Sequence, residues 1–209
     1  MGKPYSILVV DDHPLLRRGI CQLINSDSDF SLFGEAGSGL DALSAITENE
    51  PDIVLLDLNM KGMTGLDTLN AMRQEGVTSR IVILTVSDAK QDVIRIMKAG
   101  ADGYLLKDSE PDLLLEKLKE TMQGQLVISE SVKAFMLEIK DSDAELEWLN
   151  SLTPRERQIL EQLAEGKSNR TISEQLHISE GTVKVHVKNL LRKTNAKSRT
   201  EMAVRYLNQ

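Results

Sequence analysis

The sequence of 209 residues contains a single cysteine, Cys21, so no disulfide can form within the chain. No apolar run approaches the roughly 20 residues that a membrane-spanning helix needs. The segment from Met1 to Ser6 leads directly into a strand-like run and lacks the apolar core of a signal peptide. These absences predict a cytoplasmic protein without a membrane partner. The apolar neighbours of Cys21 predict a buried thiol rather than a reactive one.

The composition fits a soluble globular protein, since 41% of residues are hydrophobic and 27% are charged. The charge is unevenly divided along the chain. From Ser151 onward there are 11 Lys and Arg against 6 Asp and Glu, whereas the preceding residues carry 14 against 26. A basic end behind an acidic module suggests a nucleic-acid-binding region, although a basic face is more often only solvated surface.

The first 120 or so residues alternate between short apolar runs and amphipathic segments. The runs are rich in Val, Ile and Leu, are too short for helices and predict buried strands. The segments between them have helical periodicity, and glycines close several of them. We expect strands at 7–10, 32–35, 53–56, 81–84 and 103–106, and helices at 14–25, 39–49, 65–75, 90–99 and 111–123.

Five consecutive strand–helix units predict a parallel sheet with helices on both faces and right-handed crossovers. This is an α/β doubly wound, flavodoxin-like (CheY-like) domain, expected over 1–125. A linker is expected over 126–149, with a helix at 129–140 and the acidic stretch DSDAELE at 141–147. An all-α domain is expected over 150–209, because no strand-like run follows the linker.

The tail has the pattern of a helix-turn-helix. Thr153 and Glu156 form a capping box before a helix that ends at 165, with Pro154 at its first position. A second helix is expected at 168–176, followed by a short turn at 177–179. Ser179 can cap a third helix, at 180–193, and Ser198 a fourth, at 199–208. Two short helices across a tight turn, the second rich in lysine, are typical of DNA-reading domains.

Polar side chains follow four of the predicted strands. Because the carboxyl ends of parallel strands meet at one edge of the sheet, these side chains should converge on one pocket. A lone Asp at such a place is more often a cap or turn residue, and a lone Lys is more often solvated. Polar residues at four strand ends that point the same way favour a functional pocket over these structural interpretations. The residues are Asp11, Asp12, Asp57, Thr85 and Lys107.

Three neighbouring carboxylates repel one another and need a cation. Oxygen ligands suit Mg²⁺ or Mn²⁺ better than zinc, and His13 alone, without thiolates or a second histidine, predicts a structural role. A hard cation beside a carboxylate and a lysine is suited to accepting a phosphoryl group, with Asp57 as nucleophile and Lys107 neutralising charge. Thr85 could then donate a hydrogen bond to a phosphoryl oxygen.

The third tail helix carries the candidate DNA contacts. Lys184 and Lys188 are four residues apart and share a face. Lysines can reach guanine edges or phosphates, and Val185 could touch a thymine methyl. Arg192 and Lys193 extend the basic surface toward the backbone. Only three or four base contacts are available per copy, so we expect a homodimer on two half-sites of promoter DNA.

The N-terminal part resembles the receiver domains of bacterial response regulators, in Thr85 and in the segments VVDDHP (9–14), LLDLNM (55–60) and GYLLK (103–107). The tail is similar to the LuxR-type helix-turn-helix, in LTPRE (152–156) and TVKVHVK (182–188). Together these segments resemble the NarL/FixJ class over nearly the whole chain. LNMKGM (58–63) and LDTLN (66–70) are especially similar to nitrate/nitrite regulators of that class.

The resemblance implies a role for each matching position. Asp57 would be the phosphoacceptor, Asp12 and Asp57 direct Mg²⁺ ligands, Asp11 a ligand through water, and the Asn59 backbone carbonyl a further ligand. Thr85 and Tyr104 match the switch pair of the family. Lys107 matches its phosphate-binding lysine. Asp108 stands where proline is common, which leaves the geometry of the Lys107–Asp108 peptide bond open.

The resemblance also implies partners: a sensor histidine kinase as phosphoryl donor, RNA polymerase at the promoter, and genes of nitrate- and nitrite-responsive anaerobic respiration as targets. In similar proteins the resting receiver covers the recognition helix. Two alternatives stay open: a DNA binder whose vestigial pocket is regulated by partner binding, and a phosphotransferring enzyme such as an aspartyl phosphatase. Against the enzyme, no second acid lies two residues after Asp57, and no Walker or kinase glycine loop is present.

Overall fold

The computed structural model describes residues 3–47, 49–138, 149 and 152–207. Five βα units come first, and a two-residue strand and a 3₁₀ helix follow them. The receiver-like part contains β1 (Tyr5–Val10), α1 (Pro14–Ser26), β2 (Phe30–Ala36), α2 (Gly39–Ala45), β3 (Ile53–Leu56), α3 (Gly65–Gln74), β4 (Arg80–Thr85), α4 (Lys90–Lys98), β5 (Gly103–Leu106), α5 (Pro111–Met122), β6 (Val127–Ile128) and η1 (Glu130–Glu138).

The strands form one parallel sheet in the order β2-β1-β3-β4-β5-β6. The order of the first five strands is the flavodoxin-like one, so the predicted fold class is confirmed. The chain reverses its direction of growth between β1 and β3, and such a point opens a crevice outside the carboxyl ends of the strands. The pocket predicted from the sequence therefore lies at the position that this topology provides.

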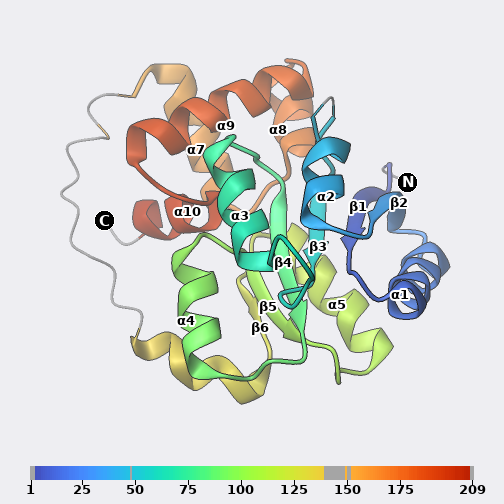
Figure 1. Cartoon of the computed structure of the whole chain (residues 1–209). Coiled ribbons are helices and arrows are strands. Elements are labelled where there is room, and N and C mark those ends of the chain that lie inside the picture. The colour runs from blue at the N-terminus through green and yellow to red at the C-terminus, as the bar shows by residue number, and fades with distance from the viewer. Residues whose placement is uncertain (1–2, 48, 139–148, 150–151, 208–209) are drawn as a thin grey trace.

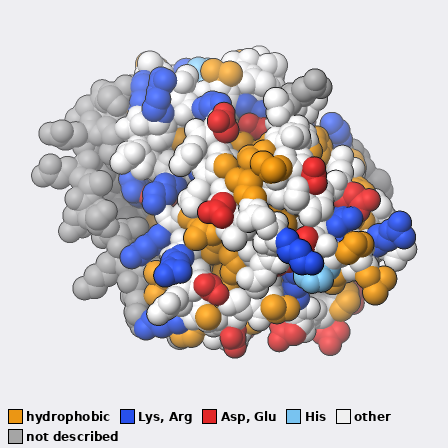
Figure 2. All heavy atoms as spheres, in the orientation of Figure 1, with side chains coloured by type: hydrophobic (Ala, Val, Ile, Leu, Met, Phe, Trp, Pro, Cys, Tyr) orange, Lys and Arg blue, Asp and Glu red, His pale blue; other side chains and the backbone are white. Residues whose placement is uncertain are grey.

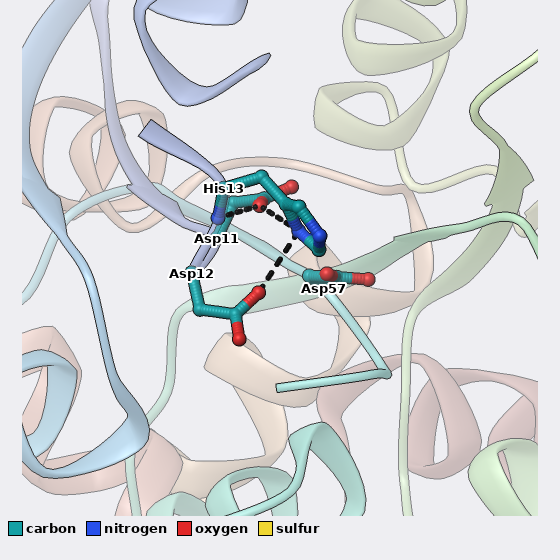
Figure 3. Close-up of side chains that lie close together, drawn as sticks. All are labelled: Asp11, Asp12, His13 and Asp57. Atoms are coloured by element: carbon teal, nitrogen blue, oxygen red, sulfur yellow. Dashed lines mark hydrogen bonds and ion pairs between the residues drawn. The ribbon is translucent and has the colours of Figure 1, made fainter. Parts of the chain in front are cut away.

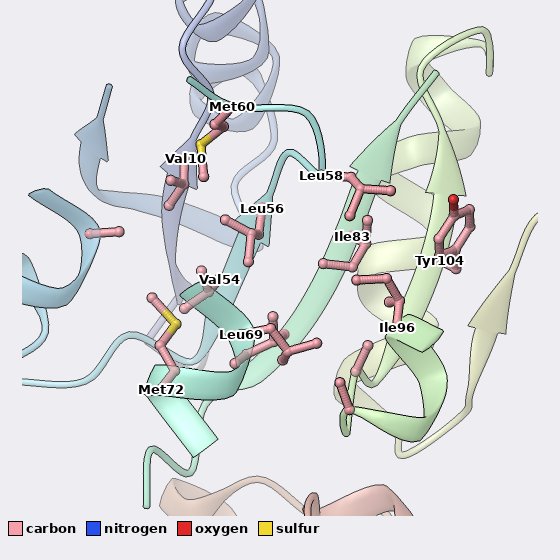
Figure 4. Close-up of a cluster of buried hydrophobic side chains, with 14 of the residues drawn as sticks. Val10, Val54, Leu56, Leu58, Met60, Leu69, Met72, Ile83, Ile96 and Tyr104 are labelled. Carbon is pink, nitrogen blue, oxygen red and sulfur yellow. The ribbon is translucent and has the colours of Figure 1, made fainter. Parts of the chain in front are cut away.

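Each face of the sheet buries its own hydrophobic cluster, because successive side chains along a strand point to opposite faces. Leu8 and Val10 of β1 pack toward α2, α3 and α4, whereas Ile7 and Val9 pack toward α1 and α5. Figure 4 shows the first cluster, in which Tyr104 lies beside Ile83 and Ile96. Cys21 belongs to the second cluster and is buried, as predicted.

The helical domain contains α7 (Pro154–Ala164), α8 (Asn169–Leu176), α9 (Glu180–Thr194) and α10 (Arg199–Leu207). The predicted capping box is present, since Thr153 and Glu156 exchange hydrogen bonds at the start of α7. Ser179 accepts from Thr182 N at the start of α9, as expected. The domain has a hydrophobic cluster of its own, which includes Ile159, Val183 and Val187. Figure 1 shows the four helices stacked against one end of the receiver-like part.

The linker differs from its prediction. The expected helix over 129–140 is a 3₁₀ helix, η1, and a short strand, β6, precedes it and pairs with β5. The acidic stretch 141–147 lies outside the described residues. The remaining differences are element ends, such as α2, which ends at Ala45 rather than 49. Within the part of the chain that the structure describes, no helix is long and apolar enough to cross a membrane.

Candidate functional site: a carboxylate pocket and a basic helix

The pocket lies at the carboxyl ends of β1, β3 and β5. Asp11 and Asp57 are buried there, with 2% and 3% of their surface exposed. Lys107, which follows β5, places Nζ 2.8 Å from Asp11 Oδ2 and 2.9 Å from Asp57 Oδ2. One ammonium group therefore holds together two carboxylates from different strands. Three of the five strand-end residues predicted to converge, Asp11, Asp57 and Lys107, thus meet in one place.

The acidic groups could hold a metal ion. One ligand atom each of Asp11, Asp12, His13 and Asp57 lies within 4.8 Å of the others. Figure 3 shows the four side chains converging on one small volume. Among the described residues, two of the buried oxygens, Asp12 Oδ1 and Asp57 Oδ2, are paired only through the ion-pair contacts of His13 Nδ1 and Lys107 Nζ, each at 2.9 Å. Closely spaced buried carboxylates repel one another, and a hard cation is the group that oxygen ligands of this kind fit.

His13 lies at the edge of this cluster and is largely exposed. Its Nδ1 is 2.9 Å from Asp12 Oδ1 and 3.3 Å from Asp11 Oδ1. Its backbone N–H donates to Asp11 Oδ1 at 2.7 Å, and the residue caps α1. These contacts fix the turn after β1, and the structural role of His13 stays a prediction.

The turns after β1 and β3 are held by backbone donors. Lys61 N donates to Asp12 Oδ2 at 3.1 Å, and Asn59 N donates to Asp57 Oδ1 at 3.3 Å. Gly65 starts α3 directly against this loop. A Cβ on Gly65 would lie 2.2 Å from the Asp57 carbonyl oxygen, so only glycine fits there. The loop that carries the predicted Asn59 carbonyl is therefore tightly constrained.

Thr85 and Tyr104 are both buried and are connected through Ser87, which the sequence did not single out. Ser87 N donates to Thr85 Oγ1 at 3.2 Å, and the Tyr104 hydroxyl donates to Ser87 O at 2.8 Å. Burial raises the pKa of Tyr104 to about 12, although the hydrogen bond with Ser87 acts in the opposite direction. Tyr104 therefore stays a neutral donor at physiological pH. The Lys107–Asp108 peptide bond, which the sequence left open, is trans.

Two lysines of the predicted DNA-reading face of α9 contact the receiver-like part, and of these Lys184 is half-buried and Lys188 is exposed. Lys184 Nζ donates to Glu50 O at 3.1 Å, and the Lys188 side chain packs on Gly76 after α3. Val185 and Arg192 are exposed. Lys193 forms an ion pair with Glu156 at 2.7 Å, within the helical domain itself. Figure 2 shows basic side chains over this domain in the upper part of the view, beside the receiver-like part.

Further contacts join the two parts at the amino ends of the strands. Arg80, at the start of β4, donates to Gly166 O at 3.2 Å. Thr200 Oγ1 of α10 donates to Asp102 Oδ1, and Lys197 Nζ donates to Lys98 O at 2.7 Å. These residues lie at the opposite end of the sheet from Asp57. The pocket and the domain contact are thus separated by the length of the strands.

Three arginines are buried in this contact: Arg73, Arg80 and Arg199. Burial, and then the positive charge of Arg80, lower the pKa of Arg199 to about 9. Asp102 lies among these groups, with Oδ2 2.7 Å from Arg73 NH2, and offsets part of their charge. Buried guanidinium groups need such partners, since unpaired buried charge is costly.

The sequence reasoning missed this contact. The only signal in the sequence was a charged residue at the start of each of two apolar strands: Arg80 is the first residue of β4, and Asp102 directly precedes β5. At those positions a charge usually marks solvated surface. Their partners in the helical domain, Gly166 and Thr200, lie 86 and 98 residues further along the chain, so no local pattern connects them.

The fold and the pocket define a receiver domain joined to a helix-turn-helix domain. Models of two families match the chain: the response regulator receiver domain over residues 7–119, and the bacterial regulatory proteins of the luxR family over 150–206. The chain therefore belongs to the response regulators with a LuxR-type DNA-binding domain. The family resemblance seen in the sequence is confirmed, and the protein is a regulator by its domain content.

Within this family, the similar proteins include nitrate/nitrite response regulators of the NarL/FixJ class. The chain is 51% identical over 209 residues to the nitrate/nitrite response regulator protein homolog of Haemophilus influenzae, covering 100% of this chain and 99% of that one. It is 50% identical to NarP of Escherichia coli, covering 99% and 96%, and 46% identical to NarL of Escherichia coli, covering 97% and 94%.

Solved structures show the same architecture. The response regulator ChrA of a heme-sensing two-component system matches with a TM-score of 0.54 at 30% identity, over 99% of both chains. A LuxR-family response regulator from Aurantimonas matches with a TM-score of 0.61 at 30% identity, over 65% of this chain and 96% of that one. The pocket residues and the DNA-reading residues predicted above thus lie on a shared fold.

Proposed function

We propose that this protein is a phosphorylation-switched transcription regulator. A sensor histidine kinase donates a phosphoryl group to Asp57, and the modification releases the LuxR-type domain to bind promoter DNA as a homodimer and to recruit or block RNA polymerase. The observation that carries this proposal is the pair of contacts from Lys107 Nζ to Asp11 and Asp57 in a buried pocket.

The chemistry follows from the side chains present. An Asp57 carboxylate oxygen attacks phosphorus, an O–P bond forms, and the N–P bond of the donor phosphohistidine breaks as the imidazole takes up a proton. Lys107 lies where it can neutralise charge on the transferring oxygens. Asp11, Asp12, Asp57 and the Asn59 carbonyl would hold Mg²⁺, which supplies further charge neutralisation when bound. The same groups would assist hydrolysis of the acyl phosphate by water.

The contacts of two α9 lysines with the receiver support the release step. Lys184 and Lys188, which we assign to DNA together with Val185, Arg192 and Lys193, contact Glu50 and Gly76 of the receiver. A side chain cannot contact the receiver and a DNA groove at once. Phosphorylation would shift the population away from this closed arrangement by favouring a receiver conformation in which Thr85 and Tyr104 rearrange.

We also propose the domain limits 1–125, 126–149 and 150–209. The two matched family regions, 7–119 and 150–206, support them. The names of the relatives support a role in nitrate- and nitrite-responsive genes of anaerobic respiration. Any sensing of the anions would then belong to the kinase.

Mass spectrometry after incubation with acetyl phosphate and Mg²⁺ tests the proposal. We expect one phosphoryl adduct that Asp57→Ala abolishes and Asp41→Ala, on the exposed side of α2, leaves in place. No adduct on the unaltered protein would instead favour a vestigial pocket. Removing residues 1–148 should raise operator affinity above that of the unphosphorylated full-length protein. Equal affinities would reject the release step.

A further inference from the structure

The first residues of the linker form a strand, β6, that pairs with β5, the strand that directly precedes Lys107. β6 pairs in parallel with β5, so that Gly103 faces Val127 and Tyr104 faces Ile128. A Cβ on Gly103 would lie 2.5 Å from Val127 Cγ2 and 2.9 Å from the Val127 carbonyl oxygen. The close approach of this linker strand therefore requires glycine at position 103.

Ser129, the first residue after β6, continues the ladder with its side chain. Its backbone N–H donates to Tyr104 O at 3.0 Å, and its Oγ accepts from Leu106 N at 3.0 Å. One linker residue thus bonds to β5 at two points. The first is the carbonyl of Tyr104, and the second is the amide that directly precedes Lys107.

The end of β5 is consequently fixed from both sides. Leu106 N–H is held by Ser129 from the linker, and Lys107 N–H donates to Thr85 O of β4 at 2.8 Å. Successive amides of a strand point in opposite directions, which is why the two bonds lie on opposite edges. The backbone that carries the Lys107 ammonium into the carboxylate pocket is clamped between Thr85 and the linker.

The linker also packs on the helix beside the switch residues. Val132 of η1 is buried in the same hydrophobic cluster as Tyr104 and Ile96, and Phe135 packs against that cluster. Any displacement of β5 or Tyr104 would therefore disturb the docking of η1 as well as β6. Figure 1 shows η1 next to α4, on the edge of the sheet that β6 closes.

We infer that Ser129 is a positioning residue that couples the linker to the phosphoryl-accepting pocket. Its hydroxyl holds the end of β5, and through it Lys107, so the docking of the linker and the occupancy of Asp57 are energetically linked. Such linkage is reciprocal. If phosphorylation of Asp57 changes the free energy of linker docking, then linker docking changes the free energy of phosphorylation by the same amount. This inference rests on the proposed phosphorylation of Asp57.

Full-length Ser129→Ala tests the inference. We expect it to slow adduct formation at Asp57 with acetyl phosphate and Mg²⁺ by roughly three- to tenfold, as fits the loss of one hydrogen bond. The ratio of operator affinities with and without phosphorylation should also fall by several-fold. Ser129→Thr keeps the hydroxyl and should restore both quantities. Ser131→Ala removes an exposed hydroxyl from the same linker and should change neither.

The outcomes separate the possible failures. If Ser129→Ala lowers the melting temperature but leaves the phosphorylation rate and the affinity ratio unchanged, Ser129 is only structural and the inference is wrong. If Ser131→Ala or Ser129→Thr shows the same defect as Ser129→Ala, the hydroxyl is not the cause and the inference is also wrong. If the unaltered protein forms no adduct at Asp57, the proposed function fails and the inference falls with it.

Discussion

Thr200 of the DNA-binding domain donates a hydrogen bond to Asp102 of the receiver, and Asp102 directly precedes the strand that leads to Lys107. The neighbouring strand has the same layout, because Arg80 contacts the DNA-binding domain at its start and Thr85 lies at its end. At about 3.3 Å per residue, each connection spans roughly 15 Å. The strands β4 and β5 therefore connect the pocket to the domain contact directly.

The Thr200–Asp102 hydrogen bond should help to keep the protein closed. Thr200→Val removes the hydroxyl at nearly constant volume, and a hydrogen bond to a charged group contributes about 1.5–3 kcal/mol. We expect operator affinity of the unphosphorylated protein, measured by fluorescence anisotropy, to rise by roughly tenfold or more. Thr200→Ser keeps the hydroxyl and should bind as the unaltered protein does. An equal increase in the fragment 149–209 would show that the contact with Asp102 is not responsible.

Mg²⁺ should stabilise the folded protein through the acidic cluster. A ligand that binds only the folded state raises stability by about 2.7 kcal/mol at a hundred times its dissociation constant. We expect the melting temperature to rise with Mg²⁺ concentration and Asp12→Asn to remove most of that rise. Without metal, Asp12→Asn should be neutral or stabilising, because it relieves repulsion among carboxylates. Asp41→Asn is the matched control, and loss of the Mg²⁺ effect there would contradict a site at Asp12.

The buried Tyr104 hydroxyl predicts a stability change at high pH. Its pKa is raised from 10.0 to about 12. A group whose pKa is higher in the folded than in the unfolded state contributes stability fully below its unfolded pKa and loses it as pH rises through the folded value. Between pH 10 and 12 the unaltered protein should therefore lose more stability than Tyr104→Phe. Urea denaturation of both proteins measures the difference, and parallel pH profiles would contradict it.

The sequence predicted those parts of the molecule that local pattern controls. Runs such as 53–56 can only be buried strands, and Thr153 and Glu156 cap α7 through bonds that span three residues. The pocket could be predicted because parallel strands bring their carboxyl ends together whatever the loops do. β6 could not, since two residues carry no periodicity and the strand exists through its pairing with β5. The contact of Asp102 with Thr200 depends on how two domains dock, which no spacing along the chain encodes.

At one point of the domain contact, the two backbones face each other directly. Gly166, after α7, has a φ of +81°, and a Cβ there would lie 1.9 Å from the Gln123 carbonyl oxygen and 2.9 Å from Gly124 Cα. Neither neighbour is a flexible side chain that could move aside. Any residue larger than glycine at position 166 must therefore push the receiver and the DNA-binding domain apart.

Gly166→Ala should open the full-length protein without phosphorylation. Alanine at a positive φ costs about 1 kcal/mol in either arrangement, whereas the clash exists only in the closed one. We expect a several-fold rise in operator affinity and a larger radius of gyration by X-ray scattering. Gly62→Ala is the control for strain alone, because Gly62 has a φ of +76° and no atom within 4 Å of its added Cβ. In the fragment 149–209, Gly166→Ala should not raise affinity, and a rise there would mean that the substitution acts on DNA binding directly rather than through the receiver.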